Sequence, residues 1–311
     1  MLPNTVTAPD KFMVLGKATM RAAQEMHLSS AALARVIGFS EPTISRIANG
    51  SRGIDPTSKE GQLALLLVQG GSKVVGLDIR AQSLDDTRAL LDPAIGDGFI
   101  GQVLDVTDRA AVAALPASLL ETVGPVDCLI NCAGMIQPFV RLAQLDDATL
   151  ERVFNVNWFG TLYMTRAFLP HLVARPEAQL VNVGSMSSIA PLPGQAIYGA
   201  SKAAIKLLTE SLYAEYMDSN LHVTLVLPGA VATNISTNSG IAMPTRSGSS
   251  DRPREVEPAD VAARTILAGI EDNAFRVLVD KMAIDADALY RRDPQLAVEA
   301  IARNFSGLLD G

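Results

Sequence analysis

The chain has 311 residues, 48% of them hydrophobic and 19% charged, which is a composition typical of a globular protein with one large domain or two smaller ones. Its formal net charge of −7 argues against a protein that coats nucleic acid or anionic membrane. The first 70 residues nevertheless carry seven Lys or Arg against five Asp or Glu, so the excess negative charge lies in the remainder.

Signals for targeting and for metal binding are absent from the sequence. Residues 1–10 lack the basic and apolar regions of a signal peptide, and the apolar run 63–68 is far shorter than the ~20 residues that span a bilayer. Cys128 and Cys132 share one apolar run and are expected to be reduced core thiols. These features predict a soluble, cytoplasmic protein without membrane contact and without a metal site.

The N-terminal part of the chain predicts a small all-α domain. Short helical segments over 13–26, 31–37 and 41–47 are joined by tight turns, and Ser30 or Ser40 can cap the helix that follows. Short helices joined by a Gly-containing turn indicate a helix-turn-helix. We therefore expect two domains, residues 1–68 and residues 69–311.

From about residue 73 onward, short apolar runs alternate with amphipathic stretches. We expect five strands and two long helices, the strands over 73–78, 100–104, 126–131, 179–183 and 223–227 and the helices over 150–172 and 200–217. Apolar strands that alternate with helices indicate a doubly wound, Rossmann-like parallel α/β sheet. Residues 233–258 are rich in Gly, Ser, Pro and Asn, and they predict a loop that covers the substrate.

Four polar residues form the candidate catalytic group. Tyr198 and Lys202 stand four residues apart and therefore on one face of a helix. A tyrosine hydroxyl titrates near ~10, and an ammonium beside it favours the phenolate, which lowers the pKa toward the range where proton transfer is possible. Ser185 ends an expected strand, from where its hydroxyl can reach the same substrate oxygen, and Asn157 lies in the long helical stretch before that strand.

Residues from about 69 to 311 resemble a short-chain dehydrogenase/reductase. The resemblance rests on five motifs in the family's order and spacing, namely Asn131-Cys132-Ala133-Gly134, Val156-Asn157 with Gly160, Ser185, Tyr198-x3-Lys202, and Pro228-Gly229-Ala230-Val231-Ala232-Thr233. It implies an oxidoreductase that transfers hydride between a nicotinamide and a secondary alcohol or ketone. Tyr198 would be the general acid/base, Ser185 would position the substrate oxygen, Lys202 would bind the nicotinamide ribose, and Asn157 would hold a water of the proton relay.

The same resemblance implies a set of cofactor-binding residues. Asp78 would accept hydrogen bonds from the adenosine ribose, and because a carboxylate there repels a 2′-phosphate, NAD is favoured over NADP. Besides Tyr198 and Lys202, the cofactor contacts would come from Asp105 and Val106 near the adenine, from Asn131, Ala133 and Gly134 on the adenosine side, and from Pro228, Gly229, Val231 and Thr233 at the nicotinamide carboxamide.

The first strand and the glycine-rich turn of that family are not evident upstream of residue 63. Such a turn lets the pyrophosphate approach the backbone at a helix N-terminus. Residues 48–55 echo it only superficially, because Gly50 and Gly53 are one residue too close and Asp55 stands where phosphate should bind. Since the first strand is central in the family, either another segment fills its place, the sheet closes up without it, or the fold is compromised by unpaired backbone groups that each cost about 1–3 kcal/mol.

Residues 11–68 resemble the helix-turn-helix part of the Xre-like antitoxins that accompany RES-type toxins. The resembling segments are residues 33–38, 40–46 with Gly50, and 58–64. This resemblance implies operator DNA and a RES-type toxin as partners, with residues 40–49 as the recognition helix, and it implies a homo-oligomer because such proteins act as dimers. The candidate DNA contacts are Thr43, Ser45 and Arg46.

Two functions therefore stand side by side. The first is an NAD-dependent oxidoreductase with an appended helical domain, impaired if the missing glycine-rich turn has no substitute. The second is an antitoxin or transcriptional regulator whose dehydrogenase-like part is only a scaffold. The antitoxin-like sequence ends and the dehydrogenase-like sequence begins within residues 63–71, where the two families have similar apolar helix sequences. This suggests the hypothesis that the chain is a fusion of the two families, joined where their sequences are alike.

Overall fold

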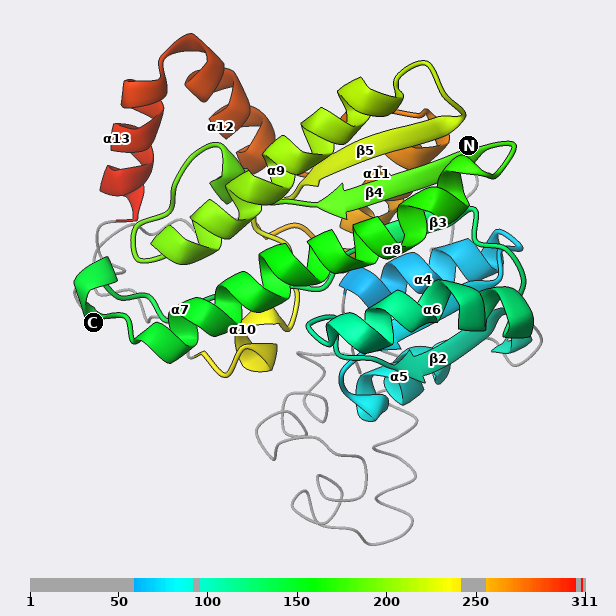
Figure 1. Cartoon of the computed structure of the whole chain (residues 1–311). Helices are drawn as coiled ribbons and strands as arrows, with labels where there is room; N and C mark the ends of the chain where they lie inside the picture. The colour runs from blue at the N-terminus through cyan, green and yellow to red at the C-terminus, as the bar shows by residue number, and fades with distance from the viewer. Residues whose placement is uncertain (1–58, 92–95, 242–255, 306–308, 310–311) are drawn as a thin grey trace, which may run out of the picture. The chain divides into compact units, whose positions relative to one another are not determined.

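The computed structural model describes residues 59–91, 96–241, 256–305 and 309. They belong to one compact unit, which spans residues 57–311. Strands and helices alternate along it (Figure 1). The predicted helix-turn-helix over residues 1–58 lies outside the described residues, and so do Thr43, Ser45 and Arg46.

The described strands are all parallel to their neighbours, which confirms the predicted parallel α/β fold. Their bounds are β1 Val74–Asp78, β2 Phe99–Val103, β3 Cys128–Asn131, β4 Ala178–Val183, β5 Leu221–Leu227 and β6 Arg276–Leu278. The sequence did not predict β6, because this strand has only three residues and begins with an arginine.

Helices connect these strands and cover both faces of the sheet. Their bounds are α4 Lys59–Gln69, α5 Ala81–Arg88, α6 Arg109–Thr122, α7 Asp147–Phe154, α8 Thr161–Val173, α9 Ala196–Tyr216, α10 Ile235–Asn238, α11 Ala259–Glu271, α12 Lys281–Arg292 and α13 Pro294–Asn304. The long helix predicted over 150–172 is α7 and α8 joined by a π-helical turn, η3 (Asn155–Gly160).

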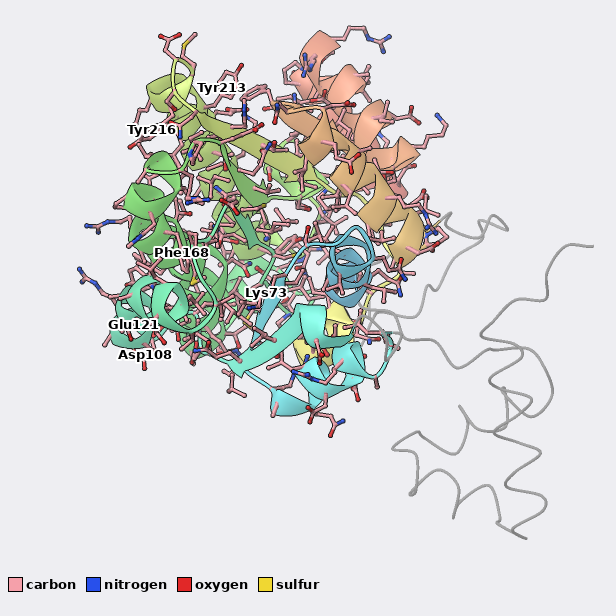
Figure 2. The ribbon with its side chains drawn as sticks, turned by 90° about the vertical axis from the view of Figure 1, so that its right-hand side faces the viewer. Lys73, Asp108, Glu121, Phe168, Tyr213 and Tyr216 are labelled. Atoms are coloured by element: carbon pink, nitrogen blue, oxygen red, sulfur yellow. The ribbon has the colours of Figure 1, made fainter. Side chains whose placement is uncertain are left out.

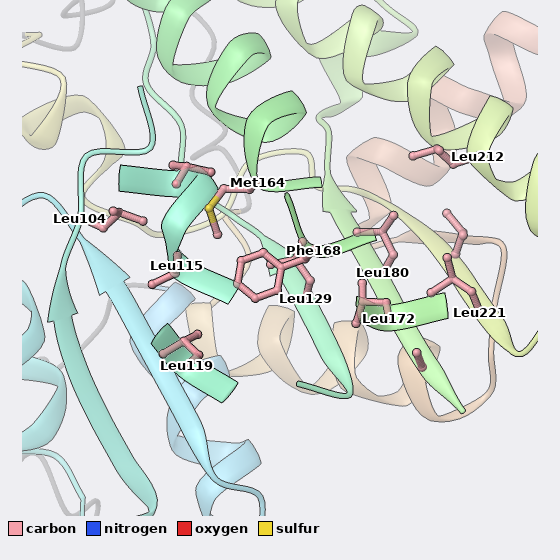
Figure 3. Packing of buried hydrophobic residues seen from close by; sticks show 13 residues of the cluster. Leu104, Leu115, Leu119, Leu129, Met164, Phe168, Leu172, Leu180, Leu212 and Leu221 are labelled. Carbon is pink, nitrogen blue, oxygen red and sulfur yellow. The ribbon is translucent and has the colours of Figure 1, made fainter. Parts of the chain in front are cut away.

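The main hydrophobic core lies between the strands and the helices α6, α8 and α9 (Figure 3). Phe168 of α8 is 2% exposed and packs in the same cluster as Leu115 of α6 and Leu180 of β4. Burial of one such aromatic side chain stabilises a fold by about 1.5–3 kcal/mol. In Figure 2 Phe168 lies inside the molecule, whereas Asp108 and Glu121 near the ends of α6 are exposed.

Helix α4 packs on the opposite side and contacts both halves of the structure. Its Leu63 packs with Val181 of β4 and Ile266 of α11, and its Val68 packs with Leu84 of α5 and Phe99 of β2. The apolar run that the sequence places at residues 63–68 therefore lies in a helix whose buried Leu63 and Val68 connect the strands β3–β6 with the strands β1–β2.

The sheet is divided into two within the described part of the chain. One piece has the order β1-β2 and the other the order β3-β4-β5-β6. The family's central first strand would lie between β1 and β3, and no described segment occupies that place. The alternative in which the sheet closes up is not observed among these residues, because β1 and β3 do not pair with each other.

Three further expectations meet the structure here. The sequence predicts core thiols at Cys128 and Cys132. The Cys128 residue is exposed overall at the start of β3, but burial raises the pKa of its thiol to about 12, and Cys132 is partly buried. The predicted loop over 233–258 contains α10, and its residues 242–255 lie outside the described residues. No described helix has both the length and the apolar character needed to cross a bilayer.

Candidate active site

The four candidate catalytic residues lie on three elements beside the sheet. Tyr198 and Lys202 are one helical turn apart on α9. Ser185 follows β4 and begins a short 3-10 turn, η4 (Met186–Ser188). Asn157 lies inside η3, so it is not in the regular α-helix that the sequence predicts. Single π-helical turns are frequent at functional sites, because the extra residue re-aims the side chains of that turn.

The Asn157 side chain is 0% exposed, and its amide is engaged on both sides. Its Oδ1 accepts from the Met135 N–H at 2.8 Å, and its Nδ2 donates to the Met135 carbonyl and to Ser201 Oγ, each at 3.0 Å. Ser201 Oγ in turn donates to the Tyr198 carbonyl at 2.7 Å. Asn157 therefore links the segment that follows β3 to the helix that carries Tyr198.

Lys202 is 3% exposed, and its Nζ donates to the Val183 carbonyl at the end of β4 at 2.9 Å. Gly134 approaches this group closely. A Cβ atom built at Gly134 would lie 3.3 Å from Lys202 Nζ and 3.4 Å from Asn157 Oδ1. Glycine at this position therefore leaves room beside the ammonium group that a larger side chain would fill.

Ser185 is tied to α9 through Ser188, which the sequence analysis did not single out. Ser185 Oγ accepts from the Ser187 N–H at 3.1 Å, and the Ser185 N–H donates to Ser188 Oγ at 3.2 Å. Ser188 Oγ donates to the Lys202 carbonyl at 3.0 Å. The hydroxyl of Ser185 is thus held in a turn that is bonded to the same helix as Tyr198 and Lys202.

The segment after β5, predicted to face the nicotinamide, is fixed by a buried carboxylate. The Pro228 carbonyl accepts from the Met186 N–H at 2.7 Å. The Gly229 N–H donates to Asp280 Oδ2 at 2.7 Å, and a Cβ atom at Gly229 would lie only 2.4 Å from Asp280 Oδ1. Asp280 also caps α12 by accepting from the Ala283 N–H at 2.8 Å. Asp280 was not predicted from the sequence, because its contact with Gly229 spans 51 residues.

The next residues of that segment are partly buried and lie before α10. Val231 forms an isolated parallel bridge with Glu257, which joins the two ends of the predicted loop over 233–258. Thr233 is partly buried two residues before the start of α10.

The predicted adenosine end of the site lies on the two-stranded sheet. Asp78 ends β1, and its Oδ1 accepts from the Arg80 N–H at 2.8 Å and lies 3.7 Å from Arg80 Nε. The Arg80 guanidinium donates to Asn238 Oδ1 of α10 at 2.8 Å. Asp105, just after β2, accepts from both the N–H and the hydroxyl of Thr107, at 2.8 and 2.7 Å.

The contact between Val106 and Gly160 explains why the motif Val156-Asn157 is followed by a glycine at position 160. A Cβ atom at Gly160 would lie 2.7 Å from Val106 Cγ2, so glycine allows η3 to approach the segment after β2. This close approach couples the turn that contains Asn157 to the predicted adenine-contacting residues.

Asn131 is buried, and its side chain points into the protein rather than toward a ligand. Its Nδ2 donates to Thr165 Oγ1 at 3.1 Å and to Asn182 Oδ1 at 2.8 Å, which uses both amide hydrogens. Asn182 Nδ2 donates to Thr209 Oγ1 at 3.0 Å. Any contact of Asn131 with a cofactor would therefore involve its backbone or its Oδ1, whereas Ala133, two residues later, is exposed.

These residues share one edge of the structure. Asp78, Asp105, Asn131, Ser185 and Pro228 all lie at or just after the carboxyl ends of β1 to β5. Ligands of open parallel α/β sheets bind outside the carboxyl ends of the strands. A dinucleotide laid along this edge would meet the carboxylates of Asp78 and Asp105 at one end and the Lys202 ammonium and the serine hydroxyls, close to Gly134, at the other. The family's phosphate-binding turn would precede α4, outside the described residues. Within the described part of the chain, no cluster of His, Cys, Asp or Glu side chains could hold a metal ion.

Comparison with known proteins identifies two families along the chain. A family model for short chain dehydrogenases matches residues 61–243, and a model for the antitoxin Xre-like helix-turn-helix domain matches residues 10–69. SadH of Mycobacterium tuberculosis, which is named as an oxidoreductase, is 31% identical over 236 residues, covering 74% of this chain and 84% of SadH. The two family matches overlap at residues 61–69, which form most of α4.

Solved structures include complexes with both nicotinamide cofactors. A short-chain dehydrogenase/reductase from Burkholderia phymatum in complex with NAD is 25% identical with a TM-score of 0.65, covering 76% of this chain and 89% of that chain. A short-chain dehydrogenase from Sphingobium yanoikuyae in complex with NADPH is 27% identical with a TM-score of 0.65, covering 78% of this chain and 91% of that chain. The chain is thus an oxidoreductase of the short-chain dehydrogenase/reductase family, which binds NAD or NADP, and it carries an Xre-like helix-turn-helix segment before its α/β unit.

Proposed function

We propose that the chain transfers hydride between NAD and the carbon of a secondary alcohol or ketone, with Asn157, Ser185, Tyr198 and Lys202 as its catalytic group. The observation that carries this proposal is the set of hydrogen bonds around Gly134, in which Asn157 is bonded through Ser201 to Tyr198 while Lys202 lies beside the same glycine. Such a set holds an acid/base, its neighbouring ammonium and a relay amide on rigid elements, as proton transfer requires.

Each residue has a distinct role in this proposal. The Tyr198 hydroxyl gives its proton to the carbonyl oxygen in reduction and takes it back in oxidation. A nicotinamide held at this edge would be the hydride donor in reduction and the hydride acceptor in oxidation. The Ser185 hydroxyl donates a hydrogen bond to that oxygen and so fixes its position. The Lys202 ammonium stabilises the Tyr198 phenolate and binds the ribose next to the nicotinamide. Asn157 holds a water through which the proton reaches solvent.

The cofactor in this proposal is NAD rather than NADP. Asp78 presents a carboxylate at the end of β1 where the adenosine ribose would lie, and a carboxylate repels a 2′-phosphate. Asp105, Val106, Ala133, Gly134 and the backbone of Asn131 complete the adenosine side. Pro228, Gly229, Val231 and Thr233 line the carboxamide side, where Asp280 fixes the Gly229 backbone.

The test is cofactor binding followed by turnover. We expect NADH to raise the unfolding temperature of the full chain and to change its own fluorescence on binding. Tyr198→Phe should retain that binding and lose turnover of a panel of secondary alcohols and ketones by at least 100-fold, since general acid–base catalysis contributes roughly 10²–10⁴-fold. Tyr213→Phe is the matched control, because Tyr213 is an exposed tyrosine farther along α9. Lack of NADH binding at millimolar concentration would overturn the proposal.

A second activity is favoured by the match of residues 10–69 to the Xre-like helix-turn-helix domain. We propose that this segment binds operator DNA through Thr43, Ser45 and Arg46, acts as a dimer, and binds a RES-type toxin. In a mobility-shift assay on the DNA upstream of its own coding region, Arg46→Ala should weaken binding, whereas Tyr198→Phe should not. Rescue of toxin-expressing cells by Tyr198→Phe would support an antitoxin role, and failure to bind both toxin and DNA would contradict this second proposal.

A further inference from the structure

Gln137 is a completely buried polar residue that has no role in the reaction proposed above. It lies six residues after the end of β3, and its side chain is 0% exposed. A buried amide is costly unless its hydrogen-bonding groups have partners. The hydrogen-bond partners of Gln137 therefore indicate its role.

The Gln137 amide is bonded to the first turn of α9. Its Oε1 accepts from the Ile197 N–H at 2.9 Å and from the Tyr198 N–H at 3.1 Å. Its Nε2 donates to the Gly194 carbonyl at 2.9 Å. The Gln137 side chain thus provides partners for two N–H groups of the first turn of α9 and for the Gly194 carbonyl just before the helix.

This arrangement replaces an ordinary helix cap. The first N–H groups of a helix have no partner within the helix, and a side chain at the residue before the helix normally satisfies one of them. Here that residue is Gln195, whose side chain makes no capping bond. Gln137 supplies the cap from about 60 residues away in sequence, which joins α9 to the segment after β3.

The joint is reciprocal, because Gln195 bonds back to the same segment. Gln195 is 2% exposed, and its Nε2 donates to the Gln137 carbonyl at 2.7 Å. Two buried glutamines therefore hold each other's segments, and α9 cannot shift along its axis without breaking bonds in both directions.

Together with the bonds of Asn157, the cap closes a ring around Tyr198. Met135 bonds to Asn157, Asn157 to Ser201, and Ser201 to the Tyr198 carbonyl. The Tyr198 N–H returns to Gln137, two residues from Met135. Hydrogen bonds therefore connect both the N–H and the carbonyl of Tyr198 to one short segment, residues 135–137, which directly follows Gly134.

We propose that Gln137 is a positioning residue for Tyr198, holding the start of α9 so that the phenol stands in the geometry for proton transfer. This rests on the proposed oxidoreductase function. Gln137 acts through the backbone of Tyr198 rather than on the substrate. A displacement of about 1 Å of a catalytic group can lower a rate by roughly 100-fold without contact to the chemistry.

The test compares two substitutions of Gln137 with a matched control. Gln137→Met has similar length but no acceptor, and Gln137→Glu keeps the acceptor while losing the bond to the Gly194 carbonyl. The control is Gln179→Met. The Gln179 amide also donates to a backbone carbonyl, that of Ile270, but it lies away from the active site. We expect kcat to fall roughly 10- to 100-fold in Gln137→Met and less in Gln137→Glu, because reacting groups held about 1 Å out of place lose up to about that factor. The KM for the ketone and the Kd for NADH should stay within about twofold, and Gln179→Met should keep the parent kcat.

A readout independent of turnover separates this inference from the proposed function. Hydrogen exchange of the Ile197 and Tyr198 amides should accelerate at least tenfold in Gln137→Met and not in Gln179→Met. Unchanged exchange at both amides, or a kcat in Gln137→Met equal to that of the parent, would overturn the positioning role even in an active enzyme. If the parent has no turnover, the proposed function is wrong, and so is the role of Gln137 in positioning Tyr198 for catalysis. Accelerated exchange in Gln137→Met would then still show that Gln137 caps α9.

Discussion

Asp78 and Arg80 place opposite charges within two residues of each other at the predicted adenosine end. The carboxylate accepts from the Arg80 backbone, and the guanidinium is directed to Asn238 of α10. A ribose with free hydroxyls would be recognised by the carboxylate, whereas a 2′-phosphate would be recognised by the guanidinium once the carboxylate is removed. We therefore expect the choice between the two cofactors to depend on the Asp78 side chain.

We expect Asp78→Ser to shift the preference from NADH toward NADPH. Loss of one charge-assisted hydrogen bond costs about 1.5–3 kcal/mol, and each 1.4 kcal/mol corresponds to about tenfold. The ratio of kcat/KM for NADH to that for NADPH should therefore fall at least tenfold. Asp85→Ser, which changes an exposed acid of α5, should leave the ratio unchanged. An unchanged ratio in Asp78→Ser would show that the carboxylate does not contact the ribose.

The candidate catalytic group follows from the five motifs of the family resemblance, and helical periodicity accounts only for the shared face of Tyr198 and Lys202. The catalytic role of these residues stays a prediction. The bonds that hold this group could not be predicted in the same way. Ser188, Gln137 and Asp280 act through contacts between segments far apart in sequence, and a buried glutamine or aspartate carries no local signal of its distant partner. The direction of the Asn131 side chain likewise depends on its partners Thr165 and Asn182.

Among the elements, the strands were predictable and their pairing was not. Apolar runs located β1 to β5, but the short β6 and the π-helical turn η3 have no periodicity that distinguishes them. The boundary predicted between residues 68 and 69 stays a prediction, because the two family matches overlap over residues 61–69, most of α4. The missing first strand left three alternatives open, and only three-dimensional pairing could distinguish them.

The pairing shows which backbone groups lack a strand partner in the described part of the chain. Asp78 O accepts from the Leu104 N–H and Asp127 O accepts from the Gln179 N–H, so these residues face β2 and β4. Successive residues of a strand direct their backbone groups to opposite sides. Val75 and Leu77 of β1 and Cys128 and Ile130 of β3 therefore direct theirs toward the place of the missing strand.

We expect this alternation to appear in hydrogen exchange of the backbone amides. The amides of Val75, Leu77 and Ile130 should exchange faster than those of their neighbours Gly76 and Leu129, which face β2 and β4. Equal protection of both sets would indicate that a segment outside the described residues pairs with both edges.

At the scale of the whole α/β unit, the predicted cofactor site is shared between two separate sheets. Asp78 and Asp105 belong to the piece β1-β2, whereas Gly134, Ser185 and Gly229 follow strands of the piece β3-β4-β5-β6. The described connections between these pieces are the side-chain packing of α4 and of the main core, together with the bond from Arg80 to Asn238. A bound dinucleotide would contact both pieces at once.

We therefore expect NADH to couple the unfolding of the two pieces. Calorimetry of the free protein should show a lower-temperature shoulder from the piece β1-β2, and NADH should merge it with the main transition. Cofactor at 100 times its Kd stabilises the folded state by about 2.7 kcal/mol. Tyr198→Phe should show the same merging, because it depends on binding and not on turnover. A single transition without cofactor would contradict this coupling.

Strand edges without a described partner also have a consequence for how the protein behaves at high concentration. An unpaired edge is a template on which another polypeptide can add a strand, and most proteins blunt such edges with charges, proline or a covering segment. Here the two edges, on β1 and β3, consist of apolar runs such as Val74-Val75 and Leu129-Ile130. If no segment outside the described residues pairs with these edges, misassembly should begin there, and the protein should stay in solution longest at low concentration and with NADH present.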